Sequence, residues 1–137
     1  MKLITRDTDY ALRAICSIAK SKNKIVPVSE LVKELKIPRP FLRKILQLLS
    51  KKKIFRSYKG SGGGFTLAVP VNKIYLLDLI KIFQGPIKLN ECFLKRKTCP
   101  NTKRCALKKK INKIEKYMFK ELRPVTVASL LAKDKEG

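Results

Sequence analysis

The chain has 137 residues, with 33 lysines and arginines against 10 aspartates and glutamates, a net charge of +23 and no histidine. This length fits one compact unit, and the apolar stretches are too short and too interrupted by charge for a membrane-spanning helix. Few acids and no histidine leave no pairing for general acid–base catalysis, so we do not expect an enzyme. The first residues lack the apolar core of a signal peptide, which predicts a cytoplasmic protein.

The positive charge is spread over the whole chain, with 33 basic side chains distributed almost evenly on either side of Pro70. An excess of this size predicts a polyanionic partner, such as the phosphate backbone of DNA. A lysine-rich surface that only keeps the protein in solution is the alternative interpretation. Charge alone does not separate the two, so the partner has to be inferred from the motifs.

Three helices are predicted in the first part of the chain. The first begins at Asp7 or Thr8 and carries apolar residues at helical spacing. The second begins at Ser29, and Pro38 separates it from a third helix that begins at Arg39. Two short helices joined by a tight break predict a helix-turn-helix.

Two β-favouring runs follow, over residues 54–58 and 65–69, with a glycine-rich segment between them. This pattern predicts a hairpin with a flexible tip, which after a helix-turn-helix is the wing of a winged helix. The glycine-rich segment lacks the Gly-Lys-Ser/Thr ending of a nucleotide-binding P-loop, so we expect it to meet a DNA backbone. The predicted fold class is therefore mainly α with a small β-hairpin.

The C-terminal half is predicted to hold a connecting helix that starts at Asn72 or Asp78 and stops at Gly85-Pro86, a long helix over 105–122, and a short last helix. In the long helix, lysines surround a narrow apolar stripe, which usually pairs with another helix, so we predict a homodimer through it. The stripe consists of Leu107, Ile111, Ile114, Met118 and Leu122.

The predicted organisation divides the chain into five segments. They are a winged helix-turn-helix region (1–70), a connecting helix (71–88), a cysteine loop (89–105), a dimerisation helix (106–123) and a C-terminal segment (124–137).

Three of the four cysteines, Cys92, Cys99 and Cys105, lie in one short segment that is rich in lysine and arginine. Positive charge favours thiolates, which bind metals and iron–sulfur clusters. A reducing cytoplasm disfavours structural disulfides. Zinc or a thiol–disulfide switch are alternatives, because the spacing itself is not diagnostic of a metal. The fourth cysteine, Cys16, lies on the apolar face of the first helix and is interpreted as a core residue.

Four motifs occur in an order that resembles the bacterial winged-helix family of transcriptional regulators that includes IscR, NsrR and CymR. They are TDYALRAI in the first helix, PFLRKIL in the third, SYKGSGGGF in the wing, and the three-cysteine loop. The resemblance covers nearly the whole chain. It implies a homodimer that reads a pseudo-palindromic operator in double-stranded DNA, with the third helix in the major groove and the wing at the minor groove.

Carried onto this sequence, the resemblance implies DNA contacts from the third helix and the wing. Arg39 and Arg43 share a helix face, and either suits guanine, whereas Phe41 and Leu42 have core packing as their alternative. Lys59 stands where the family commonly has arginine, which leaves the operator sequence open. The DNA-binding candidates are Arg39, Pro40, Phe41, Arg43 and Lys44 in the helix, and Arg56, Lys59 and Ser61 in the wing.

Family members with the three cysteines hold a 2Fe–2S or 4Fe–4S cluster through the thiolates and one other ligand. In one branch this ligand is a histidine, which the chain lacks; in another it is an aspartate near the start of the first helix of the other subunit, where this sequence has Asp9. Asp9 also suits an ordinary first-turn position, because the helix dipole favours it. The resemblance implies a regulator that senses nitric oxide, oxygen or iron–sulfur status through Cys92, Cys99, Cys105 and Asp9.

An RNA-binding protein would carry a similar charge. Such a protein exposes aromatic side chains on a sheet for base stacking, and the 7% of aromatic residues here lie in largely apolar contexts. The DNA-binding interpretation is therefore preferred, with zinc or no metal as the alternatives to the cluster.

Overall fold

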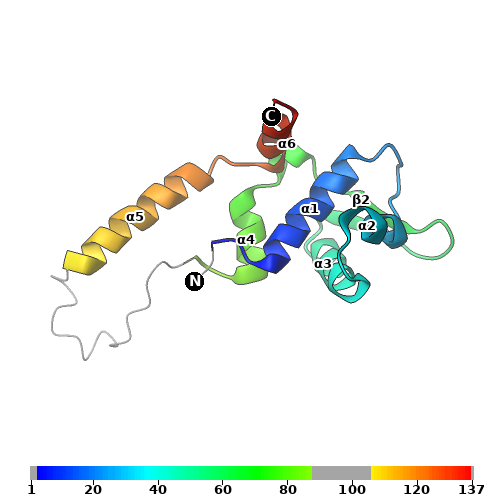
Figure 1. Cartoon of the computed structure of the whole chain (residues 1–137), viewed down its shortest axis with the longest axis horizontal. Coiled ribbons are helices and arrows are strands. Elements are labelled where there is room, and N and C mark those ends of the chain that lie inside the picture. The colour runs from blue at the N-terminus through cyan, green and yellow to red at the C-terminus, as the bar shows by residue number, and fades with distance from the viewer. Residues whose placement is uncertain (1–2, 88–105, 137) are drawn as a thin grey trace.

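The computed structural model describes residues 3–87 and 106–136 (Figure 1). Within these ranges the chain forms six α-helices, one short 3-10 helix and a two-stranded antiparallel hairpin. The mainly helical class with a small hairpin is therefore confirmed. In this described part, no helix combines the length and the apolar character needed to cross a membrane.

Helix α1 (Arg6–Lys20) lies at the centre of the fold. It packs against α3 (Arg39–Lys51), α4 (Leu76–Gln84) and β2 (Gly64–Leu67). Its buried residues recur at helical spacing, as predicted, but it begins earlier than predicted. Thr5 is the N-cap, and Thr8 lies inside the first turn, where it is fully buried. The Thr8 hydroxyl donates a hydrogen bond to Gln84 of α4 and is used for packing between helices rather than for capping.

Helices α2 (Val28–Leu35) and α3 (Arg39–Lys51) form the predicted helix-turn-helix. The turn depends on Lys36, whose left-handed backbone (φ 57°) ends α2. The N-cap of α2 is Pro27, so the prediction of Ser29 was wrong by two residues: Ser29 lies exposed in the first turn. Pro27 starts the helix because its carbonyl oxygen accepts the first backbone hydrogen bonds.

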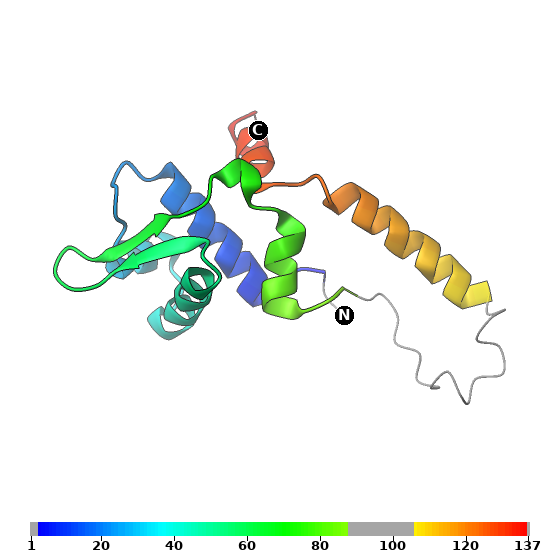
Figure 2. The same ribbon diagram turned by 180° about the vertical axis from the view of Figure 1, so that it is seen from behind.

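The wing consists of β1 (Phe55–Tyr58) and β2 (Gly64–Leu67), which pair antiparallel with Phe55 opposite Leu67. Phe55 is buried, and its ring lies 6.2 Å from that of Phe65. The wing is therefore anchored to the core at one end, and its tip extends away from the body (Figure 2).

After the wing, a 3-10 helix η1 (Val71–Lys73) leads to α4 (Leu76–Gln84). Tyr75 is the N-cap of α4, which corrects both predicted starts. Asn72 belongs to η1, and Asp78 lies in the first turn of α4. The helix begins at Tyr75 because the backbone there pairs with Thr126, a contact distant in the sequence that no local pattern encodes.

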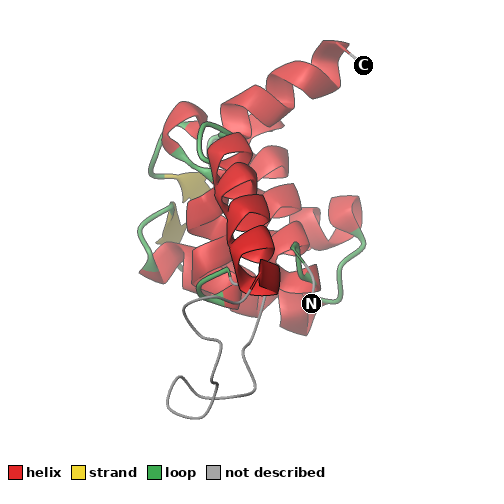
Figure 3. Ribbon diagram, turned by 90° about the vertical axis from the view of Figure 1, so that its left-hand side faces the viewer, coloured by secondary structure: helices red, strands yellow, loops and turns green. Residues whose placement is uncertain are grey.

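Helix α5 (Ala106–Leu122) extends away from the body, and α6 (Val127–Glu136) returns to it (Figures 1 and 3). The return is fixed by a backbone hydrogen bond from the Val127 N–H to the Ile74 carbonyl at 2.9 Å, and Val127 is fully buried. The last helix is longer than the predicted one and belongs to the same core as the winged helix.

Candidate nucleic-acid interface

Helix α3 separates its side chains into a buried face and an exposed one. The buried face holds Leu42, Ile45, Leu46 and Leu49. Leu42 is fully buried and Phe41 is 41% exposed, which places these two neighbours on different faces. The helix is thus held by its leucines and presents cationic side chains outward, as readout of a DNA groove requires. The exposed residues include every predicted helix candidate: Arg39, Pro40, Phe41, Arg43 and Lys44.

Phe41 contacts a residue that sequence reasoning did not single out. The guanidinium carbon of Arg6, in the first turn of α1, lies 4.7 Å from the centroid of the Phe41 ring. This is the range of a cation–π interaction. The two residues are far apart in the sequence, and no local pattern could have indicated the contact.

The wing presents its three candidates on the surface: Arg56 from β1, and Lys59 and Ser61 from the tip are all exposed. The tip turns through Gly60 and Gly62, whose φ angles of 87° and 76° favour glycine. The hairpin therefore carries basic and hydroxyl side chains on a backbone that can approach a phosphate closely.

The loop between α1 and α2 adds two further basic residues beside the wing. Val26 pairs with Phe65 of β2, and exposed Lys22 and Lys24 lie just before Val26 in the chain. These two lysines lie in no motif and were therefore not among the predicted DNA contacts. The only available signal was the run of alternating lysines.

The three cysteines of the predicted cluster site, Cys92, Cys99 and Cys105, lie outside the described residues. Asp9 lies within the described residues. Its Oδ2 atom is 3.0 Å from Nε of Arg13, one turn along α1, and both side chains are well exposed. Within the described ranges, no three histidine, cysteine, aspartate or glutamate side chains gather in a way that could hold a metal ion.

Cys16 partly fits its interpretation as a core residue. It packs against the core but is only half-buried, and it lines an open groove between α1 and α2 together with Arg13 and Glu34.

Helix α5 has no buried residue, which sets it apart from the other long helices of the fold. Leu107 and Ile114 of the apolar stripe are 66% and 48% exposed, and the other three stripe residues are partly covered. Figure 2 shows the helix standing apart from the winged helix. The stripe is therefore open to a partner.

Comparisons with known proteins agree with this geometry. A protein from Aquifex aeolicus described as "Putative HTH-type transcriptional regulator" is 41% identical over 90 residues, which are 66% of this chain and 62% of that protein. The HTH-type transcriptional regulator NsrR of Oceanobacillus iheyensis is 32% identical over 131 residues, which are 94% of this chain and 89% of NsrR.

Two solved structures show the same fold at lower identity. IscR of T. potens has a TM-score of 0.74 and 20% identity, covering 99% of this chain and 90% of IscR. CymR of B. subtilis, described as the global cysteine regulator, has a TM-score of 0.73 and 19% identity, covering 97% of this chain and 98% of CymR.

The family model Rrf2, described as an iron-dependent transcriptional regulator, matches residues 4–133. This match includes the helix-turn-helix, the wing and the long helix. The chain therefore belongs to the Rrf2 family of transcriptional regulators.

Proposed function

We propose that this chain is a homodimeric regulator that reads a two-fold symmetric operator in double-stranded DNA. The main observation in its support is that the exposed face of α3 presents Arg39, Arg43 and Lys44, and that the wing, whose first strand packs against α3, also presents basic side chains to solvent. Regulators of this family bind DNA and are typically dimeric.

The two parts of the interface have different proposed roles. On α3, Arg39 or Arg43 would donate two hydrogen bonds to O6 and N7 of a guanine, and so carry sequence specificity. In the wing, Arg56 and Lys59 would neutralise phosphates, and Ser61 would donate a hydrogen bond to one. Phosphate contacts add affinity to every sequence and weaken as salt rises.

The dimer is proposed to form through α5. Within the described residues no side chain of this helix is buried, and two members of its stripe, Leu107 and Ile114, are exposed. Two such helices packed along their stripes would remove these side chains from water. The pairing would also hold two copies of α3 at a fixed separation, as a palindromic operator requires.

For sensing, we propose that Cys92, Cys99 and Cys105 hold an iron–sulfur cluster together with Asp9 of the partner subunit. The donor set fits: three thiolates are the common ligands of such clusters, and the sequence has no histidine for the fourth position. The Asp9 carboxylate is accessible at the surface, and its pairing with Arg13 is an exposed one that costs little to break.

When bound, the cluster would supply a centre that reacts with nitric oxide and oxygen. The role of the chain is to connect this centre to DNA. Asp9 lies in the first turn of α1, and α1 packs against α3. A change in the ligation of Asp9 would therefore act on the helix that supports the recognition helix.

The decisive experiment is anaerobic purification with iron and sulfide analysis, an absorption spectrum, and selection of a binding sequence from a random duplex library. We expect iron and sulfide together and a selected palindrome. If the protein contained zinc and no sulfide, the three cysteines would form a zinc site and not a cluster site. A metal-free protein whose DNA affinity changes with thiol oxidation would indicate the thiol switch instead.

A further inference from the structure

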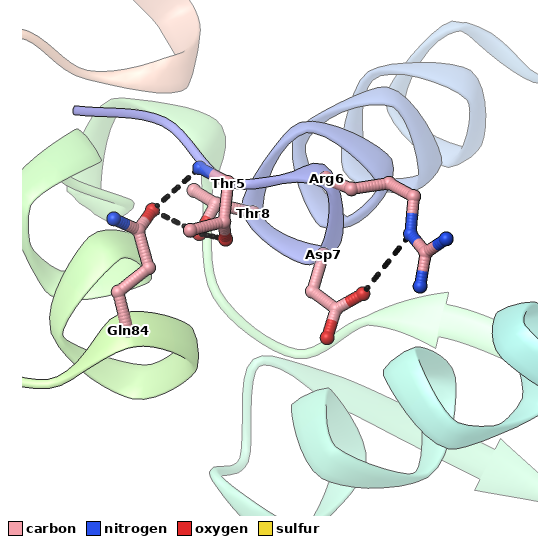
Figure 4. Close-up of polar contacts among 5 residues, drawn as sticks. All are labelled: Thr5, Arg6, Asp7, Thr8 and Gln84. Atoms are coloured by element: carbon pink, nitrogen blue, oxygen red, sulfur yellow. Dashed lines mark hydrogen bonds and ion pairs between the residues drawn. The ribbon is translucent and has the colours of Figure 1, made fainter. Parts of the chain in front are cut away.

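Gln84, the last residue of α4, makes three hydrogen bonds to the segment that leads into α1 and to its first turn, and Figure 4 shows the two that its Oε1 atom accepts. Its Oε1 atom accepts from the backbone N–H of Thr5 at 3.0 Å and from the Thr8 hydroxyl at 2.7 Å. Its Nε2 atom donates to the Leu3 carbonyl at 3.1 Å. The donors from Thr5 and Thr8 require an acceptor, so the orientation of the amide is determined.

These bonds replace a local helix cap. Thr5, the N-cap of α1, makes no capping hydrogen bond with its own side chain. Thr8 is fully buried, so its hydroxyl needs a partner, and Gln84 supplies it. The position of the first turn of α1 is therefore set by a residue of α4.

The same turn contacts the recognition helix. Arg6 lies between Thr5 and Thr8 in the sequence, and its guanidinium carbon is 4.7 Å from the ring centroid of Phe41. Phe41 lies in the first turns of α3, two residues from Arg39 and two from Arg43. A displacement of Arg6 would change the support of the end of α3 that carries these arginines.

We propose that Gln84 and Arg6 are positioning residues for DNA binding. Gln84 fixes the first turn of α1 to the end of α4, and Arg6 transmits that position to Phe41. The proposal rests on the proposed function, namely that α3 reads DNA. The chain continues from the end of α4 to the cysteines. Through Gln84 and Arg6, this end of α4 is connected to the recognition helix.

The proposal requires Gln84 and Arg6 to act on Phe41 through one connection, so the effects of changing them on DNA affinity should not add. A double-mutant cycle measures this. Gln84→Met keeps the length of the side chain and removes its amide; Arg6→Met removes the guanidinium. Each change should weaken binding to the duplex that the wild-type chain selects by about threefold to tenfold. The double variant should bind DNA no more than about twofold more weakly than the weaker-binding single variant, because either change alone already interrupts the connection from Gln84 through Arg6 to Phe41.

The control is Asn72→Ala, which removes an exposed amide from η1, and it should bind like the wild type. Independent effects, in which the two losses multiply, would overturn the proposal, as would single variants that bind normally. The salt dependence should be the same for Arg6→Met and the wild type. If the slope of log affinity against log salt concentration were smaller by about one for Arg6→Met, Arg6 would itself contact a phosphate, and the proposal would also be overturned.

Folding is checked by thermal unfolding of each variant. If Gln84→Met does not fold, Thr8→Val takes its place, because it keeps the shape of the side chain and removes the hydroxyl that donates to Gln84. Failure of the wild type to select any sequence would contradict the proposed function. Selection by the wild type without coupling between the variants would contradict only this inference.

Discussion

Val26 and Phe65 exchange two backbone hydrogen bonds, with N–O distances of 3.0 and 2.9 Å. This pair joins the loop between α1 and α2 to the second strand of the wing. The approach is so close that a Cβ atom at Gly64 would collide with the backbone of Val26, including its carbonyl oxygen. Glycine at this position is therefore a requirement of packing.

Gly64→Ala should lower the free energy of unfolding by about 1–3 kcal/mol, because the chain must either separate the wing from Val26 or accept the clash. Gly60→Ala is the matched control: it has a positive φ of 87° but nothing within 4 Å of the added carbon. Urea unfolding should show the larger loss for Gly64→Ala. Equal losses would mean that contact with Val26 does not restrict this position.

The neighbours Leu42 and Phe41 should separate stability from DNA binding. Leu42→Ala removes a fully buried side chain and should cost about 2–5 kcal/mol of unfolding free energy. Phe41 is 41% exposed, so Phe41→Ala should cost clearly less and act mainly on DNA affinity. Unfolding and binding titrations on both variants test this. A stability loss from Phe41→Ala as large as that from Leu42→Ala would show that Phe41 serves the core.

Element order and most helix ends could be predicted from the sequence because local chemistry decides them. Pro38 interrupts the chain between α2 and α3, and Gly85, with its φ of 78°, ends α4. The spacing of the apolar residues in α1 and α3 correctly predicted which face of each helix is buried. Each of these features depends on residues within a few positions of one another.

The helix starts were predicted less well, because two of them depend on contacts that are distant in the sequence. Thr5 begins α1 with Gln84 as its partner, and Tyr75 begins α4 where the backbone pairs with Thr126. Likewise, the contact between Arg6 and Phe41 joins two elements with no shared pattern. Only the folded chain brings these residues together.

Arg43 and Lys59 should differ in how they affect DNA binding. Arg43→Ala should weaken binding to the selected operator by about 1–3 kcal/mol and relax the preference at one base pair, because a bidentate contact to guanine is lost. Lys59→Ala should weaken all duplexes alike and reduce the salt slope by about one. Titrations at several salt concentrations with operator and random DNA measure both. Equal effects of Arg43→Ala on the two duplexes would argue against α3 as the reading helix.

Ile114→Glu should convert the dimer into monomers that bind DNA weakly, because it places a charge in the middle of the α5 stripe, where Ile114 is 48% exposed. Asn112→Glu adds the same charge to an exposed position of the same helix off the stripe and should remain dimeric. Light scattering distinguishes the two states. A dimer that survives Ile114→Glu would place the subunit interface on another surface.

Asp9→Ala tests the fourth cluster ligand, and the structure indicates that the fold will tolerate it. The exposed pair with Arg13 and the favourable helix-dipole position together contribute about 1 kcal/mol or less, so the variant should fold. Asp78→Ala removes an exposed acid from the first turn of another helix, α4, and serves as the control.

After anaerobic reconstitution, Asp9→Ala should retain a cluster with an altered absorption spectrum, because the three thiolates remain and the carboxylate is lost. Its DNA affinity should no longer follow the state of the cluster, since the ligand that connects the cluster to α1 is missing. Each Cys→Ser change at positions 92, 99 and 105 should instead abolish or strongly destabilise the cluster. If Asp9→Ala matched Asp78→Ala in spectrum, nitric-oxide response and DNA binding, Asp9 would be an ordinary first-turn residue, and the fourth ligand would have to come from elsewhere.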